Sequence, residues 1–263
     1  MSTAPSEFMA KVRQTTPLVH HITNYVTVND CANVCICAGG SPVMTDAIED
    51  IDDMVSIASA TVLNIGTLNE RTVDSMVAAA DCAAAVGIPM ILDPVGAGAT
   101  AYRTSVAEAL MDLGPSVIKG NAGEIGVLSG LGGDVKGVDS HGSQDAAEAA
   151  RSLAERMGCI VVATGEVDYV SDGQVTLRLS NGCGLLGKVS GTGCMLSSVV
   201  GCYAGACGAS VESMAAAISA FNVAAEIASG NCRGPGTFKP ALLDALDSLD
   251  AATLDSKARC EQL

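Results

Sequence analysis

The sequence has no tryptophan, few aromatic residues and a shortage of basic ones. Aromatic residues make up 3% of the 263 positions and apolar residues of all kinds 49%, so alanine, valine, leucine, isoleucine and methionine must build the core. Lysine and arginine number 14 against 29 acidic residues, which gives a formal net charge of −15. Nucleic acids and anionic membranes are bound by clustered basic side chains, so this balance argues against both as partners.

The chain also lacks a long apolar run and an export signal. Its most apolar stretch, 194–208, is interrupted by serine, tyrosine and glycine and is shorter than the roughly 18 residues of a membrane span. The first residues carry Glu7, Lys11 and Arg13 where a signal peptide would be apolar. The 11 cysteines form no Cys-x-x-Cys pair and are predicted to be reduced thiols. We therefore expect a cytoplasmic protein outside the membrane.

Alternating strands and helices are predicted along most of the chain. No linker or repeat divides it, so we expect one domain over residues 1–263. The predicted strands are 60–65, 88–92, 116–118 and 159–163, and the clearest helices are 70–86, 145–157, 194–207 and 212–230. This order indicates an α/β fold with a mostly parallel sheet covered on both faces.

Two further elements are predicted from turn residues. Two alternating runs meet at Asp172 and Gly173, which predicts a β-hairpin over 169–179. Pro235 and Pro240 precede a final helix near 241–249.

Glycines stand where a loop enters a helix at 189–196, which reads Val-Ser-Gly-Thr-Gly-Cys-Met-Leu. The first amides of a helix lack carbonyl partners and carry partial positive charge, and glycine allows a phosphate to approach closely. We therefore predict an anion-binding site at the amides of Gly191, Thr192, Gly193 and Cys194. Thiols at helix starts ionise readily, which makes Cys194 a candidate catalytic group. An ordinary helix start with glycine for close packing is the alternative.

Polar residues follow several predicted strands, where ligands of parallel sheets bind. Asp93 and Glu124 offer the carboxylate oxygens that Mg²⁺ prefers. Lys119 could neutralise a nucleotide phosphate, and Thr164 could contribute a hydroxyl group. The alternatives are helix caps, including a capping box of Asn121 with Glu124, a solvated charge at Lys119 and a turn at Thr164.

The polar stretch before the helix near residue 34 contains further candidates. His20 and His21 are adjacent in a strand and point to opposite sides with no nearby acid, which favours structural roles. Asn24 is the better candidate for a substrate contact, and either Thr23 or Asn24 is expected to cap the helix. Met44 fits a core position or a ligand wall.

Seven ordered blocks carry a resemblance to a known family. They are His21–Thr27, Ser41–Met44, Asp93–Ala97, Gly120–Glu124, Ala163–Glu166, Gly191–Cys194 and Gly234–Phe238. Together they resemble the hydroxyethylthiazole kinases, within the ribokinase-like superfamily, from about Pro17 to about Ala245. The Gly-Thr-Gly-Cys block is the most specific, because most ribokinase-like enzymes have aspartate where this family has cysteine.

The resemblance implies a ribokinase-like three-layer fold, and a phosphotransferase with an alcohol acceptor that acts in thiamine biosynthesis and salvage. ATP would phosphorylate the primary hydroxyl of 4-methyl-5-(2-hydroxyethyl)thiazole with Mg²⁺, in a homotrimer with active sites between subunits. By matching motif, Met44 and Asn24 would line the thiazole pocket, and Gly191 would contact the substrate through its backbone. Lys119 and Thr164 would hold ATP, and Asp93 and Glu124 would organise Mg²⁺. Cys194 would face the reacting hydroxyl.

Three positions depart from the family pattern. The family commonly has arginine at Lys119 and threonine at Ser190, and His21 often differs. Lysine keeps the charge of arginine but loses its two-point phosphate recognition, so nucleotide affinity is more affected than activity.

Three other functions compete with this one. A related ribokinase-like kinase could act on a hydroxymethylpyrimidine or a sugar. A cysteine-dependent hydrolase could use Cys194, but it needs an oriented histidine, and His20, His21 and His141 are poorly placed in sequence. A protein that binds a thiazole or a nucleotide without catalysis is the third.

Overall fold

A nine-stranded sheet forms the centre of the molecule. The computed structural model describes residues 3–131 and 142–263. The strands are β1 (Leu18–Ile22), β2 (Ser41–Met44), β3 (Ala60–Asn64), β4 (Met90–Asp93), β5 (Val117–Asn121), β6 (Ile160–Thr164), β7 (Asp168–Ser171), β8 (Thr176–Leu179) and β9 (Cys260–Gln262). Their spatial order is β2-β1-β3-β4-β5-β6-β7-β8-β9. Strands β1 to β6 are parallel, and β7, β8 and β9 extend the sheet in antiparallel pairs.

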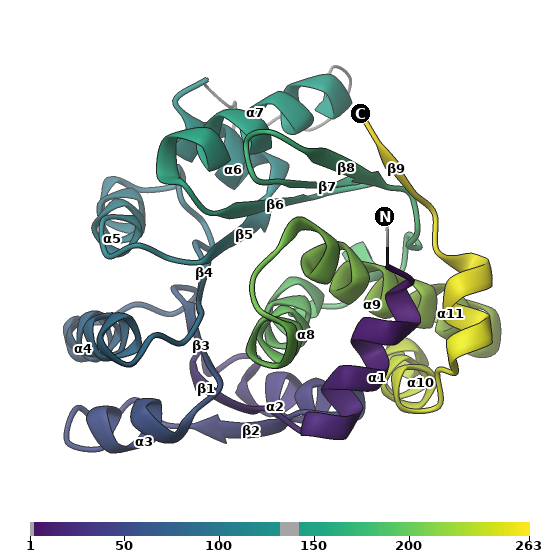
Figure 1. Cartoon of the computed structure of the whole chain (residues 1–263), viewed down its shortest axis with the longest axis horizontal. Helices are drawn as coiled ribbons and strands as arrows, with labels where there is room; N and C mark the ends of the chain where they lie inside the picture. The colour runs from purple at the N-terminus through teal and green to yellow at the C-terminus, as the bar shows by residue number, and fades with distance from the viewer. Residues whose placement is uncertain (1–2, 132–141) are drawn as a thin grey trace.

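Helices cover both faces of this sheet, as Figure 1 shows. One layer consists of α3 (Ile51–Ile57), α4 (Glu70–Val86), α5 (Ala101–Met111), α6 (Ala122–Ser129) and α7 (Gly142–Met157). The other consists of α1 (Pro5–Thr15), α2 (Val28–Ala38), α8 (Thr192–Cys207), α9 (Val211–Asn231), α10 (Pro235–Asp247) and α11 (Ala251–Lys257). Alternate residues of a strand face opposite layers, so Val62 packs with the second group and Leu63 with the first. The expected three-layer α/β fold is confirmed.

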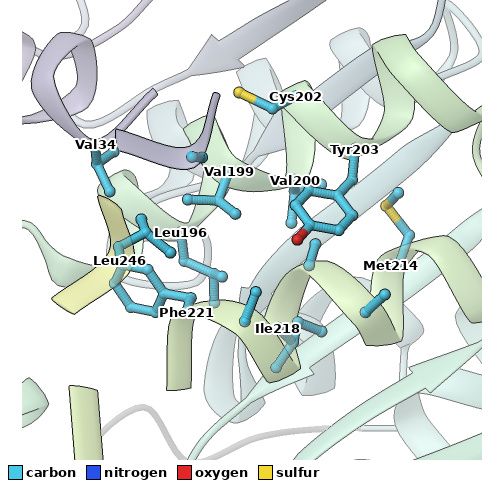
Figure 2. Packing of buried hydrophobic residues seen from close by; sticks show 14 of the residues in the cluster. Val34, Leu196, Val199, Val200, Cys202, Tyr203, Met214, Ile218, Phe221 and Leu246 are labelled. Carbon is cyan, nitrogen blue, oxygen red and sulfur yellow. The ribbon is translucent and has the colours of Figure 1, made fainter. Parts of the chain in front are cut away.

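The core between the sheet and α9 is built mostly of small and aliphatic side chains. Figure 2 shows Leu196 and Val199 of α8 packed against Ile218 and Phe221 of α9. Helix α9 is long and apolar enough to cross a membrane, but 83% of its most apolar window is buried inside the fold. Its composition is therefore explained by its place in the core.

Most predicted elements are confirmed, including the hairpin, where Gly173 has φ +91° in the turn. The prediction of a final helix near 241–249 was wrong in its bounds. Helix α10 begins at Pro235, whose missing N–H costs nothing in a first turn, and it continues through Pro240. The prediction that Thr23 or Asn24 caps α2 was also wrong, because the residue at the cap position is Thr27.

Candidate active site

Polar side chains at the ends of neighbouring parallel strands meet the N-terminus of α8. Asn64 ends β3 and Asp93 ends β4, and the two are register partners. Lys119 lies near the end of β5, and Thr164 ends β6. Ser197 of α8 donates to Asp93 Oδ2 at 2.6 Å, which fastens the helix to the strand ends. The strand order thus collects residues that are up to 133 positions apart in the sequence (Asn64 to Ser197).

Asp93 and Lys119 form a buried ion pair at the centre of this group. Lys119 Nζ lies 3.5 Å from Asp93 Oδ1 and donates to the carbonyl of Gly193 at 3.1 Å. Lys119 is 3% exposed, so the alternative of a solvated charge is wrong. Burial lowers the pKa of Lys119, but the charges of Asp93 and Glu124 outweigh it, and the net shift is upward. The ammonium group stays charged beside the start of α8.

The carboxylate of Glu124 accepts hydrogen bonds from two backbone amides. Its Oε2 accepts the amide of Asn121 at 2.8 Å, within the predicted capping box, and its Oε1 accepts the amide of Gly96 at 2.7 Å. Burial raises the pKa of Glu124, although the hydrogen bond from Gly96 acts against that shift. The carboxylate therefore ties the loop after β4 to the start of α6.

The donor set fits Mg²⁺. Asp93 Oδ1 is buried and accepts no hydrogen bond within the described residues, so it has lone pairs to offer a cation. Each oxygen of Glu124 accepts one amide and keeps further acceptor capacity. Mg²⁺ in phosphoryl-transfer enzymes commonly uses one or two carboxylates with water and substrate phosphates. No cluster of three ligating side chains occurs among residues 3–131 and 142–263.

The thiol of Cys194 lies beside two asparagine amides. Its sulfur accepts Asn24 Nδ2 at 3.1 Å and Asn64 Nδ2 at 3.3 Å. The thiol is partly buried at the third position of α8. These two N–H donors fix the position of the sulfur beside the start of α8.

The amides at the start of α8 are available to an anion. Gly191 caps the helix with φ +89°, and no side chain caps it. The first intrahelical bond joins the amide of Met195 to the carbonyl of Gly191 at 2.9 Å. The amides of Thr192, Gly193 and Cys194 therefore precede the bonded ladder and are free of carbonyl partners within the helix.

A cavity of about 710 Å³ opens beside these amides. Its lining includes Thr164 and Asn121 from the strand ends, Thr192 and Gly193 from α8, and Asp168 of β7. The hydroxyl of Thr164 donates to the carbonyl of Gly120 at 3.2 Å. The volume suits a cofactor-sized molecule.

His20 and His21 are held by hydrogen bonds within the fold. His20 bonds Thr61 and the carbonyl of Thr45, and His21 bonds Ser198 and the carbonyl of Val19. Burial lowers the pKa of His21 to about 4. Both ring nitrogens of each histidine bond groups other than the Cys194 thiol, which does not favour a hydrolase, and His141 lies outside the described residues.

Met44 and Asn24 lie toward the other edge of the sheet from the cavity. Met44 ends β2 as the register partner of His21, and it is half-buried. Asn24 is buried, and its amide is engaged by Asn64 and Cys194. Their contacts with a thiazole ring stay predictions.

Sequence reasoning missed three residues that organise the site. Asn64 and Ser197 both donate to Asp93, and Arg103 donates to the carbonyls of Ile65 and Val95 at 2.9 and 2.8 Å. Arg103 thereby fixes the loops after β3 and β4. An asparagine at position 64 of a mostly apolar predicted strand was the available signal.

Comparison with known proteins gives the family. The model of the hydroxyethylthiazole kinase family matches residues 9–252. The chain belongs to the hydroxyethylthiazole kinase family. It is 51% identical to a hydroxyethylthiazole kinase of Methanocorpusculum labreanum over 259 residues, covering 98% of each chain. It is 50% identical to one of Rubrobacter xylanophilus, covering 96% of each.

Solved structures agree with this kinase assignment. The hydroxyethylthiazole kinase protein of Pyrococcus horikoshii has a TM-score of 0.92 at 38% identity, with 98% of each chain covered. A pyridoxal kinase of Staphylococcus aureus has a TM-score of 0.58 at 18% identity over 80% of this chain and 87% of that one, which shows a shared fold. This chain, as a hydroxyethylthiazole kinase, acts in the thiamine pathway.

The buried carboxyl of Asp168 makes the kinase less stable as the pH rises. Burial raises its pKa to about 6, although hydrogen bonds from Gly165 and Asn222 act in the opposite direction. As the pH rises, Asp168 ionises in the unfolded chain before it ionises in the folded protein. The free energy of unfolding therefore falls between pH 3.8 and about 6. Asp168→Asn removes this loss, and the variant should gain about 3 kcal/mol relative to the parent between about pH 4 and pH 7. Urea unfolding at a series of pH values measures the difference, and a constant difference would contradict the assignment.

Proposed function

We propose that this kinase transfers the γ-phosphoryl group of ATP to the primary hydroxyl of 4-methyl-5-(2-hydroxyethyl)thiazole, with Mg²⁺. The observation that carries the proposal is the start of α8, where amides without carbonyl partners in the helix occur together with the Cys194 thiol and with Lys119, which bonds the carbonyl of Gly193 and pairs with Asp93. A group transferred there meets amides, a fixed ammonium charge and a candidate proton acceptor together.

Positioning and charge neutralisation supply most of the rate in such a reaction. Phosphoryl transfer passes through a loose transition state, so fixed donors around the moving group matter more than a strong base. The amides of residues 191–194 would bind the transferred group, and Lys119 would neutralise charge next to it. Asp93 and Glu124 would hold Mg²⁺, which draws charge from the phosphate oxygens when bound. Cys194 would either accept the proton of the substrate hydroxyl late or only orient its oxygen.

The two substrates would reach this point from opposite sides. ATP would occupy the cavity of about 710 Å³ beside Thr164. The thiazole alcohol would lie on the side of Asn24 and Met44, with the backbone of Gly191 against it. Lys119 already contacts Asp93 and Gly193, so it would act on phosphate as a point charge rather than as a two-point clamp.

Mass spectrometry of the thiazole alcohol after incubation with ATP and Mg²⁺ tests the proposal. A mass gain of one phosphoryl group with formation of ADP is expected. Faster turnover of a hydroxymethylpyrimidine or a sugar in a panel of alcohols would favour a related kinase. Binding without formation of ADP would favour a binding protein, and thiol-dependent hydrolysis without ATP would favour a hydrolase.

Replacing Cys194 by aspartate should keep the kinase active, within about tenfold of the parent kcat. A carboxylate has a similar reach and is already ionised at neutral pH, so it is free to accept a proton, and Asn24 and Asn64 can donate to it as they do to sulfur. Steady-state kinetics with the thiazole alcohol measure the effect. Loss of all turnover in a folded aspartate variant would contradict the role of Cys194.

A cytoplasmic homotrimer with active sites between subunits is part of this proposal. Exposed apolar side chains near the thiazole side support it, since Tyr25 and Val26 follow Asn24 directly and are 75% and 64% exposed. Contiguous exposed apolar surface of this kind marks sites of protein–protein contact when it is extensive. Light scattering on the purified protein measures its mass.

All 11 cysteines are free thiols, as a reducing compartment favours.

A further inference from the structure

The side chain of Asn64 joins the Asp93 carboxylate to the Cys194 thiol. Its Nδ2 donates to Asp93 Oδ2 at 2.6 Å and to Cys194 Sγ at 3.3 Å. Its Oδ1 accepts the amide of Gly66 at 2.9 Å and Asn24 Nδ2 at 3.0 Å. Asn64 is 1% exposed, so no solvent competes for these bonds.

The neighbours of this amide fix its orientation. The backbone N–H of Gly66 can only donate, so it must face the oxygen of Asn64. The Asp93 carboxylate, when ionised, can only accept, so it must face the nitrogen. The two N–H bonds of Asn64 are therefore divided between Asp93 and Cys194.

These two hydrogen bonds orient both the Asp93 carboxylate and the Cys194 thiol. Asn64 and Ser197 hold Asp93 Oδ2, which leaves Oδ1 toward Lys119. Asn64 and Asn24 together occupy lone pairs of the Cys194 sulfur, so a thiol hydrogen must point away from both amides. A rotation of the Asn64 amide would disturb the carboxylate and the sulfur at once.

We infer that Asn64 is a positioning residue, which holds the Cys194 sulfur and the Asp93 carboxylate in register for phosphoryl transfer. The inference rests on the proposed function for its effect on turnover. The hydrogen bonds themselves can be tested without substrate.

Asn64→Leu is the main test, because leucine has a similar volume and no donor. We expect kcat to fall between about tenfold and a hundredfold with the KM for the thiazole alcohol within about threefold, because the loss acts on the reacting groups. The Mg²⁺ concentration for half-maximal rate should rise. Alkylation of Cys194 by iodoacetamide in metal-free protein should slow about tenfold, since one donor to the sulfur is lost.

Two matched variants separate the two contacts. Asn24→Leu removes a donor from the sulfur and one of the two donors to Asn64 Oδ1. The amide of Gly66 still holds Asn64, and Asn64 still donates to Asp93, so the variant should slow alkylation without changing the Mg²⁺ requirement. Ser197→Ala removes a donor from Asp93 and leaves the sulfur untouched, so it should do the reverse. Only Asn64→Leu should change both. Peptide mapping identifies Cys194 among the 11 cysteines.

A folded Asn64→Leu protein with parental alkylation, Mg²⁺ requirement and kcat would overturn the inference. If that variant does not fold, Asn64→Ser takes its place; its single hydroxyl can donate to one partner at most, so at least one of the two shifts is expected. Failure of the parent to phosphorylate the thiazole alcohol would defeat the proposed function instead, and alkylation of Cys194 in metal-free protein would still report on the Asn64 contact.

Discussion

Asp93→Ala is expected to lower kcat for thiazole phosphorylation between about a hundredfold and a thousandfold. The variant removes a proposed Mg²⁺ carboxylate and the shared acceptor of Asn64 and Ser197. It also leaves the ammonium group of Lys119 buried without its counter-charge. An uncompensated buried charge should lower the free energy of unfolding by about 3–5 kcal/mol. Steady-state kinetics and urea unfolding measure the two effects.

The double variant Asp93→Ala with Lys119→Met separates stability from catalysis. Methionine has a similar length and no charge, so most of the lost stability should return. Activity should stay low, because neither the carboxylate nor the ammonium group is present. Recovery of kcat along with stability would show that Asp93 matters only as the partner of Lys119.

Gly191→Ala should lower kcat by about a hundredfold and destabilise the kinase. Gly191 has φ +89°, and holding alanine there costs about 1–2 kcal/mol. A Cβ at this position would also overlap the γ-methyl group of Thr27. The helix start would have to move, and a displacement of about 1 Å at reacting groups can cost a hundredfold in rate. Kinetics and thermal unfolding measure both effects.

Thr27→Ser offers a matched control, since it removes that methyl group and keeps the hydroxyl that donates to Asn24 at 3.0 Å. In the Thr27→Ser background, Gly191→Ala should regain part of the lost activity while the cost of the backbone conformation persists. An equal loss in both backgrounds would place the effect of Gly191 elsewhere.

Local patterns predicted much of the fold. Apolar runs such as 88–92 overlapped β4, which extends to Asp93, and Asp172 with Gly173 specified the hairpin turn. The capping box of Asn121 with Glu124 was also confirmed. Each of these depends on residues close together in the sequence.

Long-range contacts explain what the sequence did not predict. The amide of Asn24 bonds Asn64 and Cys194, which are 40 and 170 residues away, and α2 starts later, after Thr27. Lys119 is buried because Asp93 and Gly193 come to it from other elements. No pattern near either residue specifies these partners.

A crystal structure with ADP, aluminium fluoride, Mg²⁺ and the thiazole alcohol tests most directly whether the start of α8 binds the transferred phosphoryl group. The expected result places the fluoride mimic within hydrogen-bonding distance of the amides of Thr192, Gly193 and Cys194, with the substrate hydroxyl beside the Cys194 sulfur. A mimic bound away from those amides would contradict the proposed mechanism.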